Sequence, residues 1–83
     1  MKENFSNSSD EEILKFHKKL SNKIRLLREK NGISQLDLAL DIGIKSVAFY
    51  SNCENNRYGK HFNLEHIYKI CKSLNIKISE LFS

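Results

Sequence analysis

The sequence predicts an all-α fold of about five helices, with an N-terminal helical extension in front of them. Apolar residues recur every three or four positions along most of the chain, as they do on one face of a helix, and no segment alternates as a half-buried strand does. Two of the three glycines, Gly32 and Gly43, stand where helical patterns end, and the 83 residues contain no proline. This length predicts one small domain with a moderately large core.

The N-terminal region predicts a tail followed by a long helical segment. Residues 1–8 are polar, with too little apolar material to order a segment, and we expect a disordered tail there. Ser9 and Glu12 have the spacing of a capping box, so a helical extension is expected over residues 9–19. The apolar pattern then continues to Leu27. It predicts either one helix of about twenty residues or two helices that break near Ser21-Asn22, where helix propensity is low.

Residues 34–56 predict two short helices joined at Gly43. Ser34 is a favourable N-cap for the first helix, and Gly43 can end it in the left-handed conformation. The second helix, residues 46–54, has its best N-cap candidate in Ser46. Tyr50 and Cys53 are three residues apart and therefore share one face, which we expect to be buried. The residues that then turn wholly or partly outward are Val47, Ala48, Ser51 and Asn52.

The C-terminal part predicts an ordered loop and two more helices. The loop, NNRYGKHF, is polar and basic and contains a glycine; its Phe62 is expected in the core, and Tyr58 is expected to pack on the loop. Asn63 is a suitable N-cap for a helix that Asn75 can end in the left-handed conformation. A short last helix over residues 78–82 completes the pattern.

Composition and charge indicate a class of partner and exclude others. The net charge is +4; one lysine against four carboxylates gives residues 1–12 a charge of −3, which leaves +7 on residues 13–83. Such a basic domain favours a polyanionic partner, although solubility alone also explains it. No segment has the ~20 apolar residues of a membrane span or the layout of a secretion signal, so we expect a cytoplasmic protein. Cys53 and Cys71 lie in predicted helices and are expected to be reduced core thiols.

Several short motifs follow one another in a characteristic order over residues 20–83. They are Arg28, Gly32-Ile33-Ser34-Gln35, Leu38-Ala39, Gly43, Glu54-Asn55 and Leu81-Phe82. This order resembles the phage-repressor type of helix-turn-helix family, the Cro/XRE group. The resemblance implies a five-helix lambda-repressor-like DNA-binding domain whose third helix, residues 46–54, lies in the major groove. The chain has one residue more than its relatives usually have between the turn glycine and Glu54. We place this extra residue at Lys45-Ser46, which leaves Tyr50 and Cys53 buried.

The resemblance also implies roles for individual residues. Gln35 would bond a phosphate and brace the reading helix; its alternative role is a second cap for the preceding helix. The outward residues of the reading helix are unusually uncharged for a solvated face, which favours contact with base edges. Arg28 and Glu54 are interpreted as a structural ion pair. The expected DNA-binding residues are Gln35, Lys45, Ser46, Val47, Ala48, Ser51, Asn52, Asn55, Asn56, Arg57 and Lys60.

The resemblance further implies a homodimer on a palindromic double-stranded operator. In such folds the dimer often forms through the last two helices, which makes Tyr68, Lys72, Ile76, Ile78 and Phe82 candidates. Leu26, Leu36 and Leu40 depart from the family pattern, which usually has polar residues there. We expect the N-terminal extension to cover them through Ile13, Leu14 or Phe16; the alternative is a partner subunit.

The predicted function is sequence-specific transcription regulation, as a repressor, a restriction-modification controller or an antitoxin. The alternative is a helical protein-interaction module without specific DNA binding, such as a partner-binding antitoxin or coactivator. An enzyme is not expected, because the sequence contains no nucleophile-base pair, metal spacing or phosphate-binding glycine loop. His17 and His66 have no partner at metal-ligand spacing, so no metal is predicted. No cofactor or small-molecule ligand is predicted either.

Overall fold

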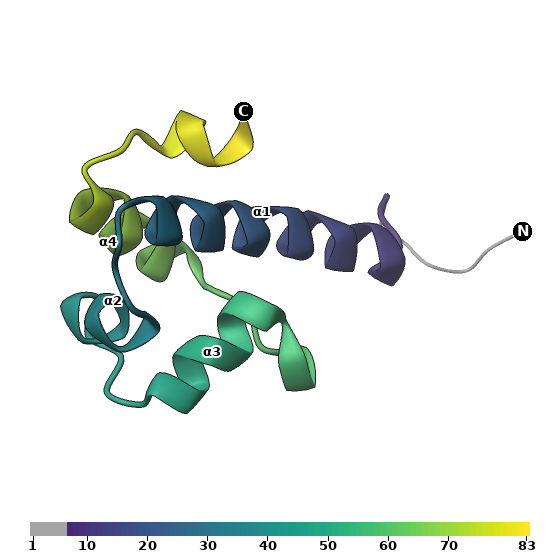
Figure 1. Cartoon of the computed structure of the whole chain (residues 1–83). Helices are drawn as coiled ribbons and strands as arrows, with labels where there is room; N and C mark the ends of the chain where they lie inside the picture. The colour runs from purple at the N-terminus through teal and green to yellow at the C-terminus, as the bar shows by residue number, and fades with distance from the viewer. Residues whose placement is uncertain (1–6) are drawn as a thin grey trace, which may run out of the picture.

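The computed structural model describes residues 7–83, which form four α-helices and two short 3-10 helices. No strand occurs in this described range, so the predicted all-α class is confirmed. The helix count differs from the prediction, because the last of the five expected helices is a 3-10 helix. The expected tail over residues 1–8 lies outside the described residues except for its last two. The elements are α1 (Asp10–Lys30), α2 (Gln35–Asp41), α3 (Val47–Asn55), η1 (Arg57–Gly59), α4 (Leu64–Leu74) and η2 (Ile78–Phe82) (Figure 1).

The extension and the first helix of the domain form one continuous helix, α1, of 21 residues. It begins with the predicted capping box between Ser9 and Glu12 and ends at Lys30, with Asn31 as the C-cap and Gly32 after it at a φ of 67°. The expected alternative, a break near Ser21-Asn22, does not occur. Ser21 is buried, and its hydroxyl donates a hydrogen bond to the carbonyl of Cys53 in α3, at 3.2 Å. Ser21 has a low helix propensity, and its contact with α3 explains why it stands inside a helix.

The turn between α2 and α3 has the predicted chemistry. The Ser34 hydroxyl accepts a hydrogen bond from the backbone N–H of Asp37 and caps α2. Gly43 adopts a φ of 86°, a conformation that residues with a Cβ rarely adopt, and Ile44 after it is buried in the core. The Ser46 hydroxyl accepts from the N–H of Phe49 and caps α3. The position of both helices is therefore as the local sequence predicts.

The remaining elements close the core from the other side. Phe62 is buried, as expected, and Asn63 caps α4, which ends at a left-handed Asn75 with a φ of 55°. Leu81 of η2 is 1% exposed and attaches the C-terminal segment to the core. Cys53 and Cys71 are free, buried thiols, as expected.

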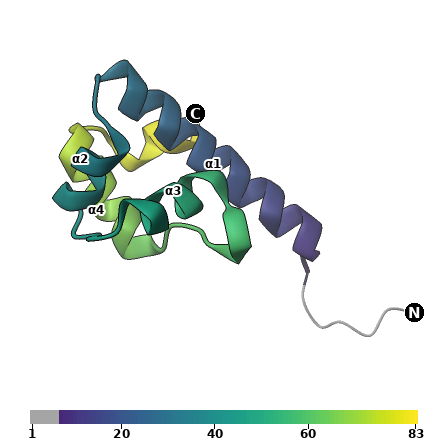
Figure 2. The same ribbon diagram turned by 60° about the horizontal axis from the view of Figure 1, so that its bottom comes forward.

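Helix α1 crosses the molecule, and its main neighbours are α3 and η2 (Figure 1). Its N-terminal turns extend past the other helices in both views, while its C-terminal half lies against them (Figures 1 and 2). Within residues 7–83, no helix combines the length and the apolar character needed to cross a membrane. The core residues are Leu20, Ile24, Leu38, Ala39, Ile42, Ile44, Tyr50, Cys53, Phe62, Ile67, Ile70, Cys71, Leu74 and Leu81.

The expectation that the extension covers Leu26, Leu36 and Leu40 is wrong. All three leucines are about half exposed, and so are Ile13 and Leu14. Because α1 is a single rigid helix, Ile13 stays about 20 Å from Leu26 along its axis and cannot fold back onto it. The extension packs elsewhere: the ring of Phe16 stacks on that of Phe82 in η2, with centroids 5.9 Å apart.

Candidate nucleic-acid interface

Helix α3 has one buried and one exposed face, in the register predicted from the sequence. Tyr50 and Cys53 are fully buried, while Val47 and Ala48 are exposed. Ser51 and Asn52, one turn further along, are partly exposed. The single charged residue of α3 is the buried Glu54, so the exposed face carries no charge. A helix face of this kind presents short polar and methyl groups instead of the long charged side chains of an ordinary solvated face.

The Glu54 carboxylate holds α3 in place by accepting four hydrogen bonds. Arg28 of α1 donates from Nε and Nη2, at 2.9 and 3.0 Å, and the Tyr50 hydroxyl donates at 2.7 Å. The fourth donor is the amide of Gln35, at 2.9 Å. Burial by itself raises the pKa of Glu54, but these hydrogen bonds outweigh it and lower the pKa below its ordinary value. The carboxylate is therefore ionised and links α1, α2 and α3.

Gln35, the first residue of α2, does not act as a second cap for α2, because the Ser34 hydroxyl has that role. The Nε2 of Gln35 donates to Oε1 of Glu54 instead. An amide nitrogen carries two N–H groups, so one donor of Gln35 is left after this contact. The side chain is partly exposed and lies where α2 meets α3.

Exposed cations surround α3. Lys45 precedes the helix, and Arg57 and Lys60 follow it in and after η1. In the part of the chain that the structure describes, none of these three side chains forms an ion pair. Their charges are therefore available to an external anion.

The three asparagines at the end of α3 are placed differently. Within residues 7–83, the Asn52 amide has no hydrogen-bond partner and both its donor and acceptor are available. The Asn55 amide donates to the carbonyl of Ser51 at 2.9 Å. The Asn56 amide points inward, to Ser21 Oγ and the carbonyls of Cys53 and Lys60, at 3.2 to 3.4 Å. Asn56 thus holds the turn after α3, in a left-handed conformation with a φ of 54°.

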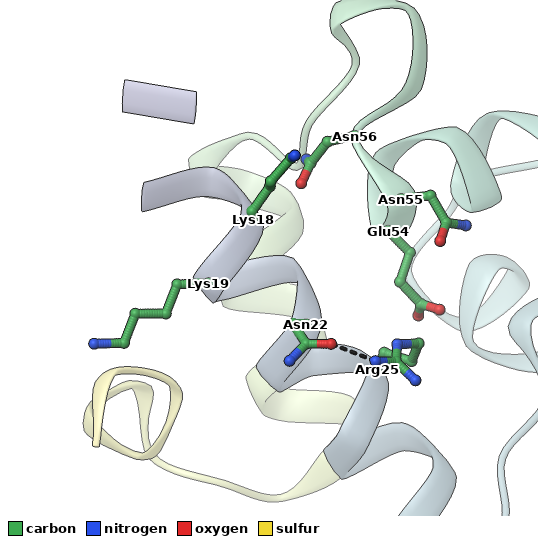
Figure 3. A pocket seen from close by; sticks show the side chains of 7 residues that line it. All are labelled: Lys18, Lys19, Asn22, Arg25, Glu54, Asn55 and Asn56. Carbon is green, nitrogen blue, oxygen red and sulfur yellow. Dashed lines mark hydrogen bonds between the residues drawn. The ribbon is translucent and has the colours of Figure 1, made fainter. Parts of the chain in front are cut away.

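Sequence reasoning missed two features near α3. Tyr58 does not pack on the loop: its side chain is 83% exposed, on a backbone with a φ of 55°. Lys18, Asn22 and Arg25 of α1 form one wall of a cleft whose other wall is the end of α3 (Figure 3). Their helical spacing places them on one face of α1, but nothing in the sequence indicates that α3 lies opposite.

Four of the five candidate dimer residues meet at an apolar groove on α4 and η2. The groove has a volume of about 450 Å³ and is lined by Leu64, Tyr68, Cys71, Lys72, Ile76 and Ile78. The fifth candidate, Phe82, lies apart from it and contacts Phe16.

No group of three or more His, Cys, Asp or Glu residues in the described range is arranged to hold a metal ion. The ring of His17 stacks on that of His61, with centroids 4.0 Å apart, and joins the extension to the segment before α4.

Helices α2 and α3 are short, each is capped by a serine, and the left-handed Gly43 lies in the turn between them. The exposed face of α3 is uncharged and has cations at both ends. This arrangement is that of a helix-turn-helix DNA-binding domain. The chain belongs to the helix-turn-helix family of Cro/XRE type: the family model described as "Helix-turn-helix" matches residues 24–81. Searches of curated proteins and of solved structures gave no significant match. Residues before position 24, which include the whole extension over residues 9–19, lie outside the family match.

Proposed function

We propose that this protein is a sequence-specific transcription regulator that inserts α3 into the major groove of double-stranded DNA. One observation carries the proposal: the exposed face of α3 is uncharged, and exposed Lys45, Arg57 and Lys60 stand around it. The major groove is wide enough for a helix, and its base edges match short polar and methyl groups, whereas the phosphates on either side attract cations. We place the protein in the cytoplasm, together with its DNA target.

The base-reading role falls to the outward residues of α3. The free Asn52 amide has the donor and acceptor that adenine requires for a two-pronged contact. Val47 and Ala48 offer methyl groups to thymine, and the Ser51 hydroxyl can donate to a base acceptor. These contacts specify the sequence.

The phosphate-binding role falls to groups at the ends of α3. Lys45, Arg57 and Lys60 supply charge, and the second amide N–H of Gln35 supplies a directed donor beside α3. The Ser46 hydroxyl accepts a hydrogen bond from the N–H of Phe49, which leaves its proton for a phosphate oxygen. Asn55, the last residue of α3, is exposed and can also contact a phosphate. Asn56 has a smaller role, because its amide nitrogen already has partners in the protein.

The regulator acts as a homodimer on a palindromic operator, with half-sites ~34 Å apart. The apolar groove on α4 and η2 supports this arrangement, because Tyr68 and Ile78 border it and are both more than half exposed. Repressor, restriction-modification controller and antitoxin are the roles that fit such a small regulator.

Selection of bound fragments from a random genomic library, followed by footprinting, tests the proposal. The expected result is one recurring site with two-fold symmetry, bound at least 10³-fold more tightly than unrelated DNA. Binding that depends on salt but is indifferent to sequence would overturn the proposed function.

A protein-interaction module remains the second candidate, because Leu26, Leu36 and Leu40 are about half exposed in the described range, residues 7–83. Such exposed apolar side chains are available to contact another protein. Two results together would favour this function. The selection would recover no DNA site, and a protein partner would bind the wild type but not Leu36→Glu.

A further inference from the structure

An open cleft lies between α1 and the end of α3, next to the surface assigned above. Its volume is about 590 Å³, and one wall comes from the middle of α1 (Figure 3). In Figure 3 the ammonium of Lys18 is directed toward Asn56, whereas that of Lys19 is directed away from α3. The residues that line the cleft are Lys18, Lys19, Asn22, Arg25, Glu54, Asn55 and Asn56.

The charges of the cleft favour an anion. Lys18 is exposed and forms no ion pair with any residue from 7 to 83. Arg25 bonds to the Asn22 amide, and its contact with Glu29 is a half-exposed pair at 3.7 Å, which is weak. The one carboxylate of the lining, Glu54, is 4% exposed, and Arg28 neutralises it. Lysine, guanidinium and amide donors without a free counter-charge are the groups that bind phosphate oxygens.

The cleft continues the exposed face of α3. Asn55 belongs to both: it lines the cleft, and its amide is bonded to Ser51 on the exposed face. A helix that occupies the major groove has a phosphate chain on each side, because the groove is only about 12 Å wide. A chain that passes the C-terminal end of α3 therefore enters the space in front of Lys18 and Arg25.

We infer that this cleft binds the sugar-phosphate backbone of the same DNA whose groove α3 enters, an inference that rests on the proposed function. Lys18 and Asn22 precede residue 24, where the family match begins. The part of α1 before the matched region thus adds Lys18 and Asn22 to a phosphate-binding wall whose third member, Arg25, lies inside that region. Its contacts raise affinity for every sequence and read no base.

Lys18→Ala, Arg25→Ala and the double variant test the inference, with Lys23→Ala as the matched control. Lys23 is on the same helix and its replacement removes the same charge, but it lies about 140° around the helix from Lys18 and does not line the cleft. The affinity for the selected operator is measured at several salt concentrations. The slope of log K against log salt should become less negative by about 0.9 for each phosphate that the variant no longer neutralises. The deficit of Lys18→Ala relative to wild type should then shrink about 3.5-fold between roughly 50 and 200 mM salt.

A backbone substitution locates the contact. Neutral methylphosphonates are placed one at a time along each strand of the operator. At the phosphate that Lys18 contacts, the substitution should weaken wild-type binding and leave the binding of Lys18→Ala unchanged. Base preference should be the same in all variants, and thermal unfolding confirms that each is folded.

The outcomes separate this inference from the proposed function. If wild type binds its operator and Lys18→Ala and Arg25→Ala keep the slope of Lys23→Ala, the cleft is not a backbone site, while the proposed function stands. If wild type selects no operator, both fail.

Discussion

The guanidinium of Arg28 in α1 and the carboxylate of Glu54 in α3 form a buried, two-pronged ion pair, with nitrogen–oxygen distances of 2.9 and 3.0 Å. Arg28 also donates to the carbonyl of Ile33 at 2.7 Å, just before α2. The pair therefore fixes the direction of α3 relative to the two preceding elements. The orientation of the residues that face DNA in the proposed complex depends on this ion pair, although Arg28 and Glu54 themselves do not touch the DNA.

Removing the Glu54 side chain should strongly destabilise the fold. In Glu54→Ala the buried Arg28 loses its main partner, which costs about 3–5 kcal/mol of unfolding free energy. Tyr50→Phe removes only one donor to a charged group and should cost about 1.5–3 kcal/mol. Urea denaturation measures both values. If Glu54→Ala loses less unfolding free energy than Tyr50→Phe, then Glu29, which lies 3.8 Å from Arg28, replaces Glu54 as its partner.

Stability should fall in acid because of Glu54. Its pKa is lowered in the folded state, so the unfolded chain binds this proton more readily, and the contribution of Glu54 is fully present above its ordinary value of 4.5. That contribution is lost as the pH falls through the folded-state pKa. Glu54→Gln has no such proton to bind and should show a flatter dependence below pH 4.5, measured as unfolding free energy against pH. Parallel curves for the two proteins would assign the acid transition to other carboxylates.

Asn52 and Arg57 should differ in what they contribute to binding. Asn52→Ala should relax preference at one base pair by about 1–3 kcal/mol, because it removes a contact to a base edge. Arg57→Ala should weaken all sequences alike and reduce the salt slope by about 1. Competition binding with single-base operator variants measures the difference. Loss of base preference in Arg57→Ala alone would mean that α3 is rotated from the proposed register.

Tyr68→Glu should dissociate the proposed dimer while the monomer stays folded. Tyr68 borders the apolar groove and is 67% exposed, so a carboxylate there is tolerated in the monomer but not inside an apolar interface. Sedimentation at several concentrations gives the dimer constant. Leu26→Glu is the control, as an exposed apolar residue of α1 outside the groove. If only the control dissociates the dimer, the exposed leucines form the interface.

Phe16→Ala should lower stability by about 1 kcal/mol, because it removes the stacked contact with Phe82. Leu14→Ala is a suitable control: Leu14 is similarly exposed and lies outside the core cluster, so the change should stay within about 0.5 kcal/mol. Thermal or urea unfolding compares the two. Equal values would mean that the extension contributes nothing to stability through η2.

The capped ends of the helices and the buried face of α3 could be predicted from the order of residues alone. Ser9, Ser34 and Asn63 accept from backbone N–H groups three residues away, and Gly43 requires only its own backbone conformation. Such interactions act within one turn, so the local sequence contains them. The burial of Tyr50 and Cys53 followed in the same way from their spacing.

Contacts between residues far apart in the chain could be known only from the tertiary structure. The sequence left open whether α1 breaks at Ser21, because the answer depends on a hydrogen bond to Cys53 of α3, 32 residues away. The cover expected for Leu26 was wrong because a continuous α1 cannot fold back on itself. Likewise, Lys18 and Asn55 become walls of one cleft only when α1 packs on α3. The rules of helix formation are local, whereas a surface made by two helices depends on their mutual placement.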